Sequence, residues 1–256
     1  MYSDENKPVA MSIAGLDPSG GAGILADAKS FHAHGVYATC VVTTLTSQNP
    51  FCVNDVKKVD PGFIEDQIDT IMDVYNIKYV KTGLLYNKEI VKLIQRKIKE
   101  YNLLAVVDPV MISESGSNLV GESFACSIKK YLLKYAYIIT PNIYEAEQLS
   151  GITIENQQDM ITVAETLSKN CSCVITGGHM HGNDTLSTDG EIFTIKGKMI
   201  DSKNTHGTGC NYSSALTSRL IQGHSIKKSC ILANKFIQTS IRNGFFNTPY
   251  QFEDKF

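Results

Sequence analysis

The stretch VAMSIAGLDPSGGAGILADAKSF, residues 9–31, joins a β-strand, a glycine-rich turn and an α-helix in direct succession. The apolar run from Val9 to Ala14 predicts a buried strand. After the turn GLDPSGGAG, apolar residues from Ile24 to Phe31 recur at the spacing of one helix face. A strand, a turn and a helix in this order are typical of α/β folds with a parallel sheet.

The same alternation continues to the end of the chain. Helical patterns separate the later strand-like runs VYATCVVTTLT (36–46), IKYVKTG (77–83), LLAVVDP (103–109), YAYIIT (135–140) and CSCVITGG (171–178). A hairpin is then predicted at Asp189–Gly190, between DTLST and EIFTI, and two helices start near Gly207 and Ser225. We expect one domain, residues 1–256, with a central, mostly parallel β-sheet flanked by helices on both faces.

Composition narrows the classes of function. The 256 residues are 43% hydrophobic and 20% charged, with a formal net charge of −2. This near-neutral balance does not predict a basic surface that would bind nucleic acid or an anionic membrane. No apolar run approaches the roughly 20 residues of a membrane span, and the polar, acidic start does not resemble a secretory signal. Seven cysteines, an odd number, indicate reduced thiols. We therefore expect a cytoplasmic protein.

Polar residues and glycines follow most of the predicted strands. They are Gly15 to Gly23 after the first strand, then Gln48 and Asn49, Gly83, Asp108, Asn142, and Gly177 with Gly178. Parallel strands point their carboxyl ends the same way, so these residues should line one edge of the sheet. Open α/β sheets bind ligands at that edge, and the convergence therefore predicts a ligand site there.

Two common phosphate-binding motifs fit poorly. A P-loop needs GxxxxGK[ST], but the pair Gly197–Lys198 is followed by methionine. The segment GAGILA, residues 21–26, matches the dinucleotide fingerprint GxGxxA. An acidic residue is then expected about 20 positions onward, yet the second strand ends in TTLTSQNP. The missing carboxylate argues against an NAD-dependent oxidoreductase.

A third candidate is NTHGTGC, residues 204–210, directly before a predicted helix. Gly207, Thr208 and Gly209 would place unpaired backbone N–H groups at the positive end of that helix, where an anion binds well. Cys210 lies in the first turn, and the same field favours its thiolate. The segment could hold a phosphoryl group and supply a base. A cysteine packed as a small hydrophobe behind a glycine turn is the alternative.

Several motifs in order resemble one family over nearly the whole chain. They are IAGLDPSGGAGILADAKSF, TSQNP, VKTGLL, VVDPVM, TPNIYEAEQLSG, GGH and NTHGTGC. The chain resembles the hydroxymethylpyrimidine/phosphomethylpyrimidine kinases of thiamine biosynthesis, in the ribokinase-like superfamily. The resemblance implies ATP-dependent phosphorylation of 4-amino-5-hydroxymethyl-2-methylpyrimidine (HMP) and of its monophosphate, with Mg²⁺. It also implies a ribokinase-like fold and a homodimer.

The resemblance also implies roles for individual residues. Cys210 stands where the superfamily signature DTxGAGD ends in a catalytic aspartate, and Gly207, Thr208 and Gly209 form the anion hole. The pyrimidine pocket would consist of Gly15, Asp27, Gln48, Leu84 and Val110. The metal would be held by Asp108 and Glu145. The nucleotide phosphates would be bound by Asn142, Thr176, Lys203 and His206.

Two positions depart from the family pattern. Thr176 replaces a lysine that relatives use for the nucleotide phosphates, so either Lys203 or Mg²⁺ supplies the missing positive charge or the affinity for ATP is weaker. Leu84 replaces a methionine, which nearly conserves volume. The polar segment 113–123 is our candidate for a lid.

Other interpretations remain open for several residues. Asn142 and Glu145 match a capping box. Asp27 could lie on a solvated helix face, and Gln48 could serve in a turn. The cysteines and histidines of the segment CSCVITGGHMH suggest a zinc site, but their spacing matches no standard zinc finger. Alternative functions are a pyridoxine/pyridoxal kinase of the same branch and a non-catalytic pyrimidine-binding protein.

Overall fold

The computed structural model describes residues 7–113, 116, 118–121, 123–178 and 182–252. Nine strands form one sheet in the order β3-β2-β1-β4-β5-β6-β7-β8-β9. They are β1 (Val9–Leu16), β2 (Tyr37–Asn49), β3 (Cys52–Lys58), β4 (Tyr79–Thr82), β5 (Leu104–Val107), β6 (Ala136–Ile139), β7 (Ser172–Ile175), β8 (Asp184–Thr188) and β9 (Glu191–Ile195). The run from β2 to β7 is parallel, whereas β3, β8 and β9 pair antiparallel. The predicted mostly parallel sheet is confirmed.

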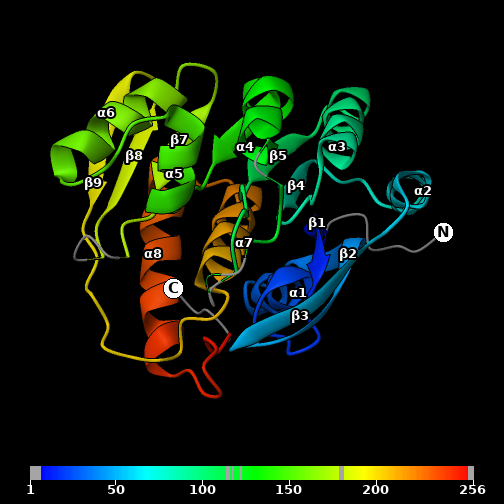
Figure 1. The fold of residues 1–256 in the computed structure, drawn as a ribbon, viewed down its shortest axis with the longest axis horizontal. Helices are drawn as coiled ribbons and strands as arrows, with labels where there is room; N and C mark the ends of the chain where they lie inside the picture. The colour runs from blue at the N-terminus through cyan, green and yellow to red at the C-terminus, as the bar shows by residue number, and fades with distance from the viewer. Residues whose placement is uncertain (1–6, 114–115, 117, 122, 179–181, 253–256) are drawn as a thin grey trace.

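Helices cover both faces of the sheet (Figure 1). They are α1 (Gly23–Ala33), α2 (Pro61–Met72), α3 (Lys88–Glu100), α4 (Phe124–Ser127), α5 (Ile143–Ser150), α6 (Gln157–Leu167), α7 (Thr208–Ile221) and α8 (Ile226–Arg242). Neighbouring residues of β5 show the division, since side chains alternate across a strand. Val107 packs in the core that contains α2 to α6, and Val106 packs in the core that contains α7 and α8.

Two segments differ from the prediction. Strand β3 was not predicted, because most of its residues are polar, all are half-exposed or exposed, and they show no clean alternation. It forms a hairpin with β2 through Asn49, whose Oδ1 accepts from the backbone N–H groups of Phe51 and Cys52. The helical pattern predicted before the run 135–140 is interrupted: one turn of α4 is followed by a π-helix, η1 (Ile128–Leu132), and a 3₁₀ turn, η2 (Leu133–Tyr135).

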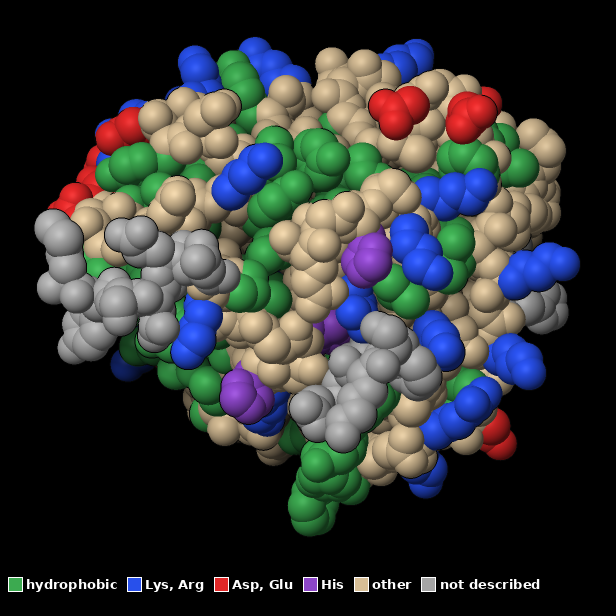
Figure 2. All heavy atoms as spheres, turned by 180° about the vertical axis from the view of Figure 1, so that it is seen from behind, with side chains coloured by type: hydrophobic (Ala, Val, Ile, Leu, Met, Phe, Trp, Pro, Cys, Tyr) green, Lys and Arg blue, Asp and Glu red, His purple; other side chains and the backbone are tan. Residues whose placement is uncertain are grey.

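Charged side chains are unevenly distributed over the surface. The face opposite that of Figure 1 carries more basic than acidic side chains (Figure 2), so the net charge of −2 hides an uneven distribution. Within the described ranges, no helix is long and apolar enough to span a bilayer. Residues 114, 115, 117 and 122 of the predicted lid, and both histidines of the CSCVITGGHMH segment, lie outside the described residues.

Candidate active site

Helix α7 begins at the carboxyl edge of the sheet with an unusual turn. Its N-cap, Gly207, has φ 86°, and a Cβ at this position would collide with the carbonyl oxygen of Gly21. Only glycine can adopt this positive φ and also fit against the Gly21 carbonyl. The turn therefore packs directly on the first glycine-rich loop. Among the described residues no side chain caps α7. The backbone N–H of Thr208, one of the predicted anion-hole residues, already donates to the carbonyl of Thr205 at 3.0 Å. The helix thus leaves the N–H groups of Gly209 and Cys210 in its first turn available to an anion.

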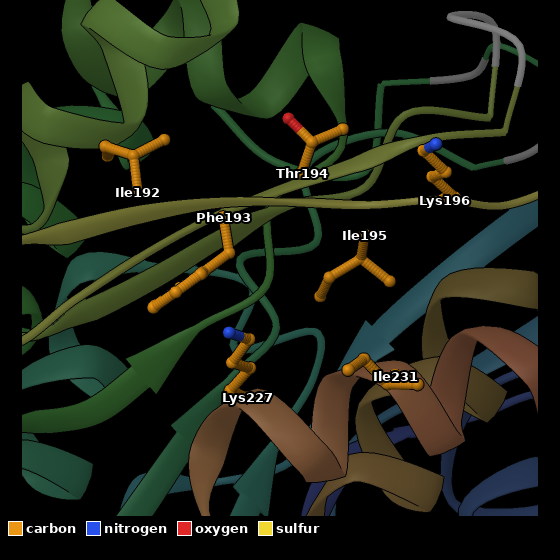
Figure 3. Close-up of a pocket in the computed structure, with 7 residues that line it drawn as sticks. All are labelled: Ile192, Phe193, Thr194, Ile195, Lys196, Lys227 and Ile231. Carbon is orange, nitrogen blue, oxygen red and sulfur yellow. The ribbon is translucent and has the colours of Figure 1, made fainter.

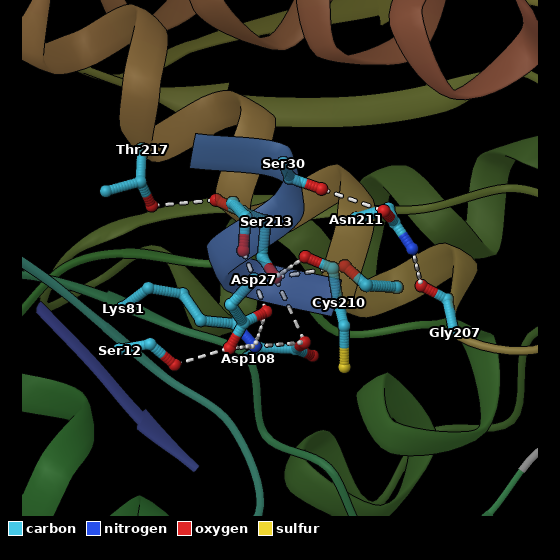
Figure 4. A network of polar contacts seen from close by, with 12 residues as sticks. Ser12, Asp27, Ser30, Lys81, Asp108, Gly207, Cys210, Asn211, Ser213 and Thr217 are labelled. Carbon is cyan, nitrogen blue, oxygen red and sulfur yellow. Dashed lines mark hydrogen bonds and ion pairs between the residues drawn. The ribbon is translucent and has the colours of Figure 1, made fainter. Parts of the chain in front are cut away.

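Cys210 lies in that first turn and is partly exposed. Burial raises the pKa of its thiol to about 12, although Lys81 and the backbone N–H of Gly23 act in the opposite direction. The sequence predicts that the helix field favours the thiolate of Cys210, but desolvation outweighs the favourable charges and the pKa lies above its usual value. Cys210 is a neutral thiol near pH 7. Figure 4 shows the Cys210 side chain beside the Asp108 carboxylate, and the charges of Lys81, Asp108 and Asp27 act on its thiol.

Asp27 is enclosed by polar groups of the protein. Its side chain is fully buried on α1, and both of its oxygens are already engaged. Lys81 Nζ lies 2.9 and 3.0 Å from the two oxygens. Ser12 and Ser214 donate to them at 2.5 and 2.8 Å. The solvated-face interpretation of Asp27 is wrong, since the carboxylate is enclosed by protein donors, and its contact with a pyrimidine ring stays a prediction.

Asp108 and Glu145 lie buried where β5 and β6 end. Asp108 Oδ2 accepts from Ser213 at 3.1 Å and lies 3.6 Å from Lys81 Nζ. Burial raises the pKa of Asp108, and Lys81 opposes that rise. Burial, followed by the charge of Asp108, raises the pKa of Glu145 to about 8. Negative charge at this point is therefore only partly compensated by protein groups.

The capping-box interpretation of Asn142 and Glu145 is confirmed. Asn142 Oδ1 accepts from the backbone N–H of Glu145 at 2.9 Å, and Glu145 Oε2 accepts from that of Asn142 at 3.0 Å. The second oxygen of Glu145 faces the backbone N–H of Met111 at 3.4 Å. Asn142 also forms a backbone bridge with Thr176 at the end of β7. Two of the four residues that were predicted to bind nucleotide phosphates, Asn142 and Thr176, are thus neighbours.

His206 is also paired with a buried side chain. Its ring is buried, and Nε2 lies 2.8 Å from Asp17 Oδ2. Burial raises the pKa of Asp17, but the bonds from His206, Ser19 and Gln48 outweigh that and hold it well below the usual value. The contact of His206 with phosphates stays a prediction, and its Nε2 is engaged by Asp17. In this way His206 joins the NTHGTGC turn to the glycine-rich loop, and Gln48 reaches the same carboxylate.

The remaining predicted residues are at the same edge. A Cβ on Gly15 would meet Thr44 Oγ1 at 2.5 Å and Leu84 Cδ2 at 3.4 Å, so Gly15 and Leu84 adjoin. Val110 is half-buried just after Asp108, and Lys203 is exposed before the α7 turn. Across the described ranges, no three His, Cys, Asp or Glu residues are grouped to hold a metal ion by themselves.

A separate hollow lies between β9 and α8 and has a volume of about 450 Å³ (Figure 3). It is lined by residues 192–196 with Lys227 and Ile231, and the Lys227 ammonium lies 3.7 Å from the centre of the Phe193 ring. None of the predicted site residues lines this hollow.

Sequence reasoning missed three polar residues of the site: Asp17, Lys81 and Ser213. Lys81 could have been found, because it interrupts the apolar run of a central parallel strand, which is covered on both faces. A charge in such a place requires a partner. Asp17 and Ser213 carry no comparable signal, since aspartate and serine are ordinary residues in a turn and a helix.

The fold and this edge define a ribokinase-like phosphotransferase: a parallel sheet with a glycine turn, a cysteine and buried carboxylates at its carboxyl edge. Residues 17–251 match the family model described as phosphomethylpyrimidine kinase. The chain belongs to the phosphomethylpyrimidine kinase family. It is 36% identical over 241 residues to the hydroxymethylpyrimidine/phosphomethylpyrimidine kinase of Bacillus subtilis, covering 91% of this chain and 89% of that protein.

Other relatives extend the comparison. The bifunctional thiamine biosynthesis protein ThiED of Geobacter sulfurreducens is 37% identical, and the chain spans about half of its length (49%). The phosphomethylpyrimidine kinase of Clostridium difficile is structurally similar with a TM-score of 0.80 at 37% identity, covering 91% and 98% of the two chains. Bacillus subtilis pyridoxal kinase, solved as an ADP complex, gives 0.87 at 33% identity, covering 94% of each chain.

Proposed function

We propose that this protein transfers the γ-phosphoryl group of ATP to the hydroxymethyl group of HMP, and then a second phosphoryl group to the monophosphate. The observation that carries the proposal is the uncapped first turn of α7, with Cys210 in it, beside the buried carboxylates at the sheet edge. Family membership identifies the kind of substrate.

The proposed step requires a base and an anion site. The hydroxymethyl oxygen bonds to the γ-phosphorus while the bond from that phosphorus to ADP breaks. The hydroxyl proton passes to the thiolate form of Cys210. The backbone N–H groups of Gly209 and Cys210 stabilise the charge on the phosphoryl oxygens. A pKa of about 12 makes the thiolate scarce at neutral pH but strongly basic, and the second property favours proton removal.

Asp108 and Glu145 fit a role with Mg²⁺. Both are buried carboxyl groups with raised pKa values, and hard oxygen ligands of this kind suit Mg²⁺. A divalent cation there would neutralise phosphate charge. Glu145 retains its bond to the backbone of Asn142, so the capping box would orient the carboxylate.

Gly15, Gln48, Leu84 and Val110 are the residues that we propose for the pyrimidine pocket. Gln48 carries both a donor and an acceptor, which suits an aminopyrimidine edge. Its bond to Asp17 fixes its position next to the glycine-rich loop. Asp27 is left out of this pocket because it is enclosed.

Asn142, Thr176 and Lys203 are proposed for the nucleotide side. Asn142 and Lys203 are exposed and Thr176 is half-buried, so all three remain accessible to a phosphate chain. Likeness to a pyridoxal kinase that was solved with ADP supports a nucleotide at this edge. The predicted homodimer and cytoplasmic location stay predictions.

A second candidate function is phosphorylation of pyridoxal, because pyridoxal kinases are among the most similar structures. The glutamine in TSQNP favours the aminopyrimidine. The test is kcat/KM for HMP and for pyridoxal with the same MgATP concentration. We expect HMP to be preferred at least about tenfold, which corresponds to about 1.4 kcal/mol. A preference for pyridoxal would reassign the substrate.

A further inference from the structure

A lysine lies enclosed in the middle of the sheet. Lys81 is on β4, between β1 and β5, and its side chain has no exposed surface. Burying an ammonium group is unfavourable unless opposite charges surround it. None of the roles considered above uses this residue. Its position, directly under the proposed site, raises the question of what it does there.

Lys81 bridges two carboxylates (Figure 4). Its Nζ lies 2.9 and 3.0 Å from the two oxygens of Asp27 and 3.6 Å from Oδ2 of Asp108. The backbone after β4 also packs closely on the ammonium group, since a Cβ on Gly83 would lie 3.1 Å from Lys81 Nζ. The ammonium is therefore held at one fixed point.

The two carboxylates in turn hold the start of α7. Ser213 donates to Asp108 Oδ2 at 3.1 Å, and Ser214 donates to Asp27 Oδ1 at 2.8 Å. Both serines lie three or four residues after Cys210, so all three side chains share one side of the helix. The first turns of α7, which carry Cys210, are thus hydrogen-bonded to the two carboxylates that Lys81 bridges.

We propose that Lys81 is a positioning residue of the phosphotransfer reaction, which anchors the first turn of α7 through Asp27 and Asp108 and places a fixed positive charge beneath Cys210. The proposal rests on the proposed function for its catalytic readout. The charge of Lys81 also opposes the rise in the pKa of the Cys210 thiol, as the placement requires.

A purely structural role makes a different prediction. If Lys81 only neutralises Asp27, then removing both charges together should restore a normal protein, since buried ion pairs are often replaceable by uncharged groups. If Lys81 positions the site, the doubly neutral protein should fold but react poorly. The activity of the protein that lacks both charges therefore distinguishes a purely structural role of Lys81 from a positioning role.

The experiment uses the full chain as three variants, Lys81→Met, Asp27→Asn and the double variant. Lys81→Met leaves Asp27 without its counter-ion and is expected to lower the melting temperature most. In the double variant, the asparagine at position 27 can still accept a hydrogen bond from Ser12 or Ser214, but Asp108 loses its counter-ion. We therefore expect a melting temperature between those of Lys81→Met and the wild type. Lys78→Met is the matched control, because Lys78 is an exposed lysine just before β4.

Two readouts are measured on each folded variant: kcat and KM for HMP and ATP, and the alkylation rate of Cys210 by iodoacetamide, followed by mass spectrometry of its peptide. For the double variant we expect kcat to fall about 100-fold with KM nearly unchanged, and alkylation to slow about tenfold. Asp27→Asn keeps the cation, so its alkylation rate should equal or exceed that of the wild type. Lys78→Met should change neither readout.

Wild-type kcat and alkylation in the double variant would show that Lys81 only neutralises Asp27. If that variant fails to fold, Asp27→Asn decides, because slower alkylation of Cys210 there would contradict a role for the Lys81 charge. Alkylation needs no substrate. If the wild-type protein did not phosphorylate HMP, the kinase proposal would fail while the test of Lys81 remained valid.

Discussion

The two halves of the sheet edge are built differently. On the side of α7, Asp17, Asp27 and Asp108 are buried, and each is held by several protein donors. On the side of β7, Asn142 is exposed and Thr176 is half-buried. The first half is fixed by folding itself, whereas the second leaves its polar groups to an incoming ligand. Preorganised groups act most strongly on charge that develops during a reaction, so the α7 half should control kcat and the β7 half should control KM for ATP.

The largest expected effect comes from Cys210→Ala in the α7 half. Loss of the base should lower kcat about 10²- to 10⁴-fold, with an unchanged melting temperature. The control is Cys126→Ala, which removes an exposed thiol on α4. Steady-state kinetics with HMP and MgATP give the comparison. A Cys210→Ala protein with full activity would remove the thiol from the mechanism.

The pH dependence of Cys210 tests how the α7 half is buried. With a thiol pKa of about 12, the thiolate fraction grows about tenfold per pH unit throughout pH 7–10, and the alkylation rate should do the same. A thiol with an ordinary pKa of 9.0 would instead level off above about pH 9. Peptide mass spectrometry after brief iodoacetamide treatment measures the rate. A plateau of the alkylation rate near pH 9 would mean that desolvation does not dominate the pKa of the Cys210 thiol.

Gly207→Ala tests the turn between the glycine-rich loop and α7. Its positive φ and its contact with Gly21 should lower the free energy of unfolding by about 1–3 kcal/mol, and kcat should fall with it. Gly209→Ala is the matched control, because a Cβ at that position meets no atom within 4 Å. Alanine is the better helix former, so the control should unfold no more easily than the wild type. Equal losses of unfolding free energy in both variants, measured by urea unfolding, would show that the positive φ and the close packing of Gly207 do not matter for stability.

Asn142→Ala examines the β7 half. Loss of the capping bond should lower the free energy of unfolding by about 1 kcal/mol, and KM for ATP should rise while kcat changes little. Asn156→Ala removes the equivalent cap of α6, so it should reproduce the loss of stability without the change in KM. If both variants left KM unchanged, Asn142 would be a cap and nothing more.

The smallest effect is expected for Thr176→Lys. A lysine at this half-buried position would add a positive charge on the nucleotide side and lower KM for ATP by up to about fivefold, the range of a partly exposed ion pair. Thr194→Lys adds the same charge at an exposed position of β9 and should leave KM unchanged. A kcat effect as large as that of Cys210→Ala would break the division between the two halves.

Much of the fold was predictable because it follows from local patterns. Apolar runs and helical spacing predicted the parallel strands and their helices, and the Asp189–Gly190 hairpin follows from turn chemistry. Strand β3 was missed since its polar residues pack weakly and pair only with β2. The break in the helix at η1 has no signal that we can identify in the sequence.

The candidate site was predicted by position but not by environment. Gly207 and Cys210 lie where the motif suggested, and the capping box of Asn142 forms as expected. Asp27 and His206 were assigned to ligands, yet each pairs with another buried side chain. Such pairs join residues that are 54 and 189 positions apart. Only the folded sheet brings them together, and the same burial decides the pKa of Cys210.

The most direct measurement is ³¹P NMR of the wild-type protein incubated with HMP, ATP and Mg²⁺. A phosphomonoester signal should appear in step with ADP, followed by the signal of a diphosphate ester as the monophosphate is consumed. Release of ADP without any phosphoester, or tight binding of HMP with no change in ATP, would contradict the assignment of this edge as a pyrimidine kinase site.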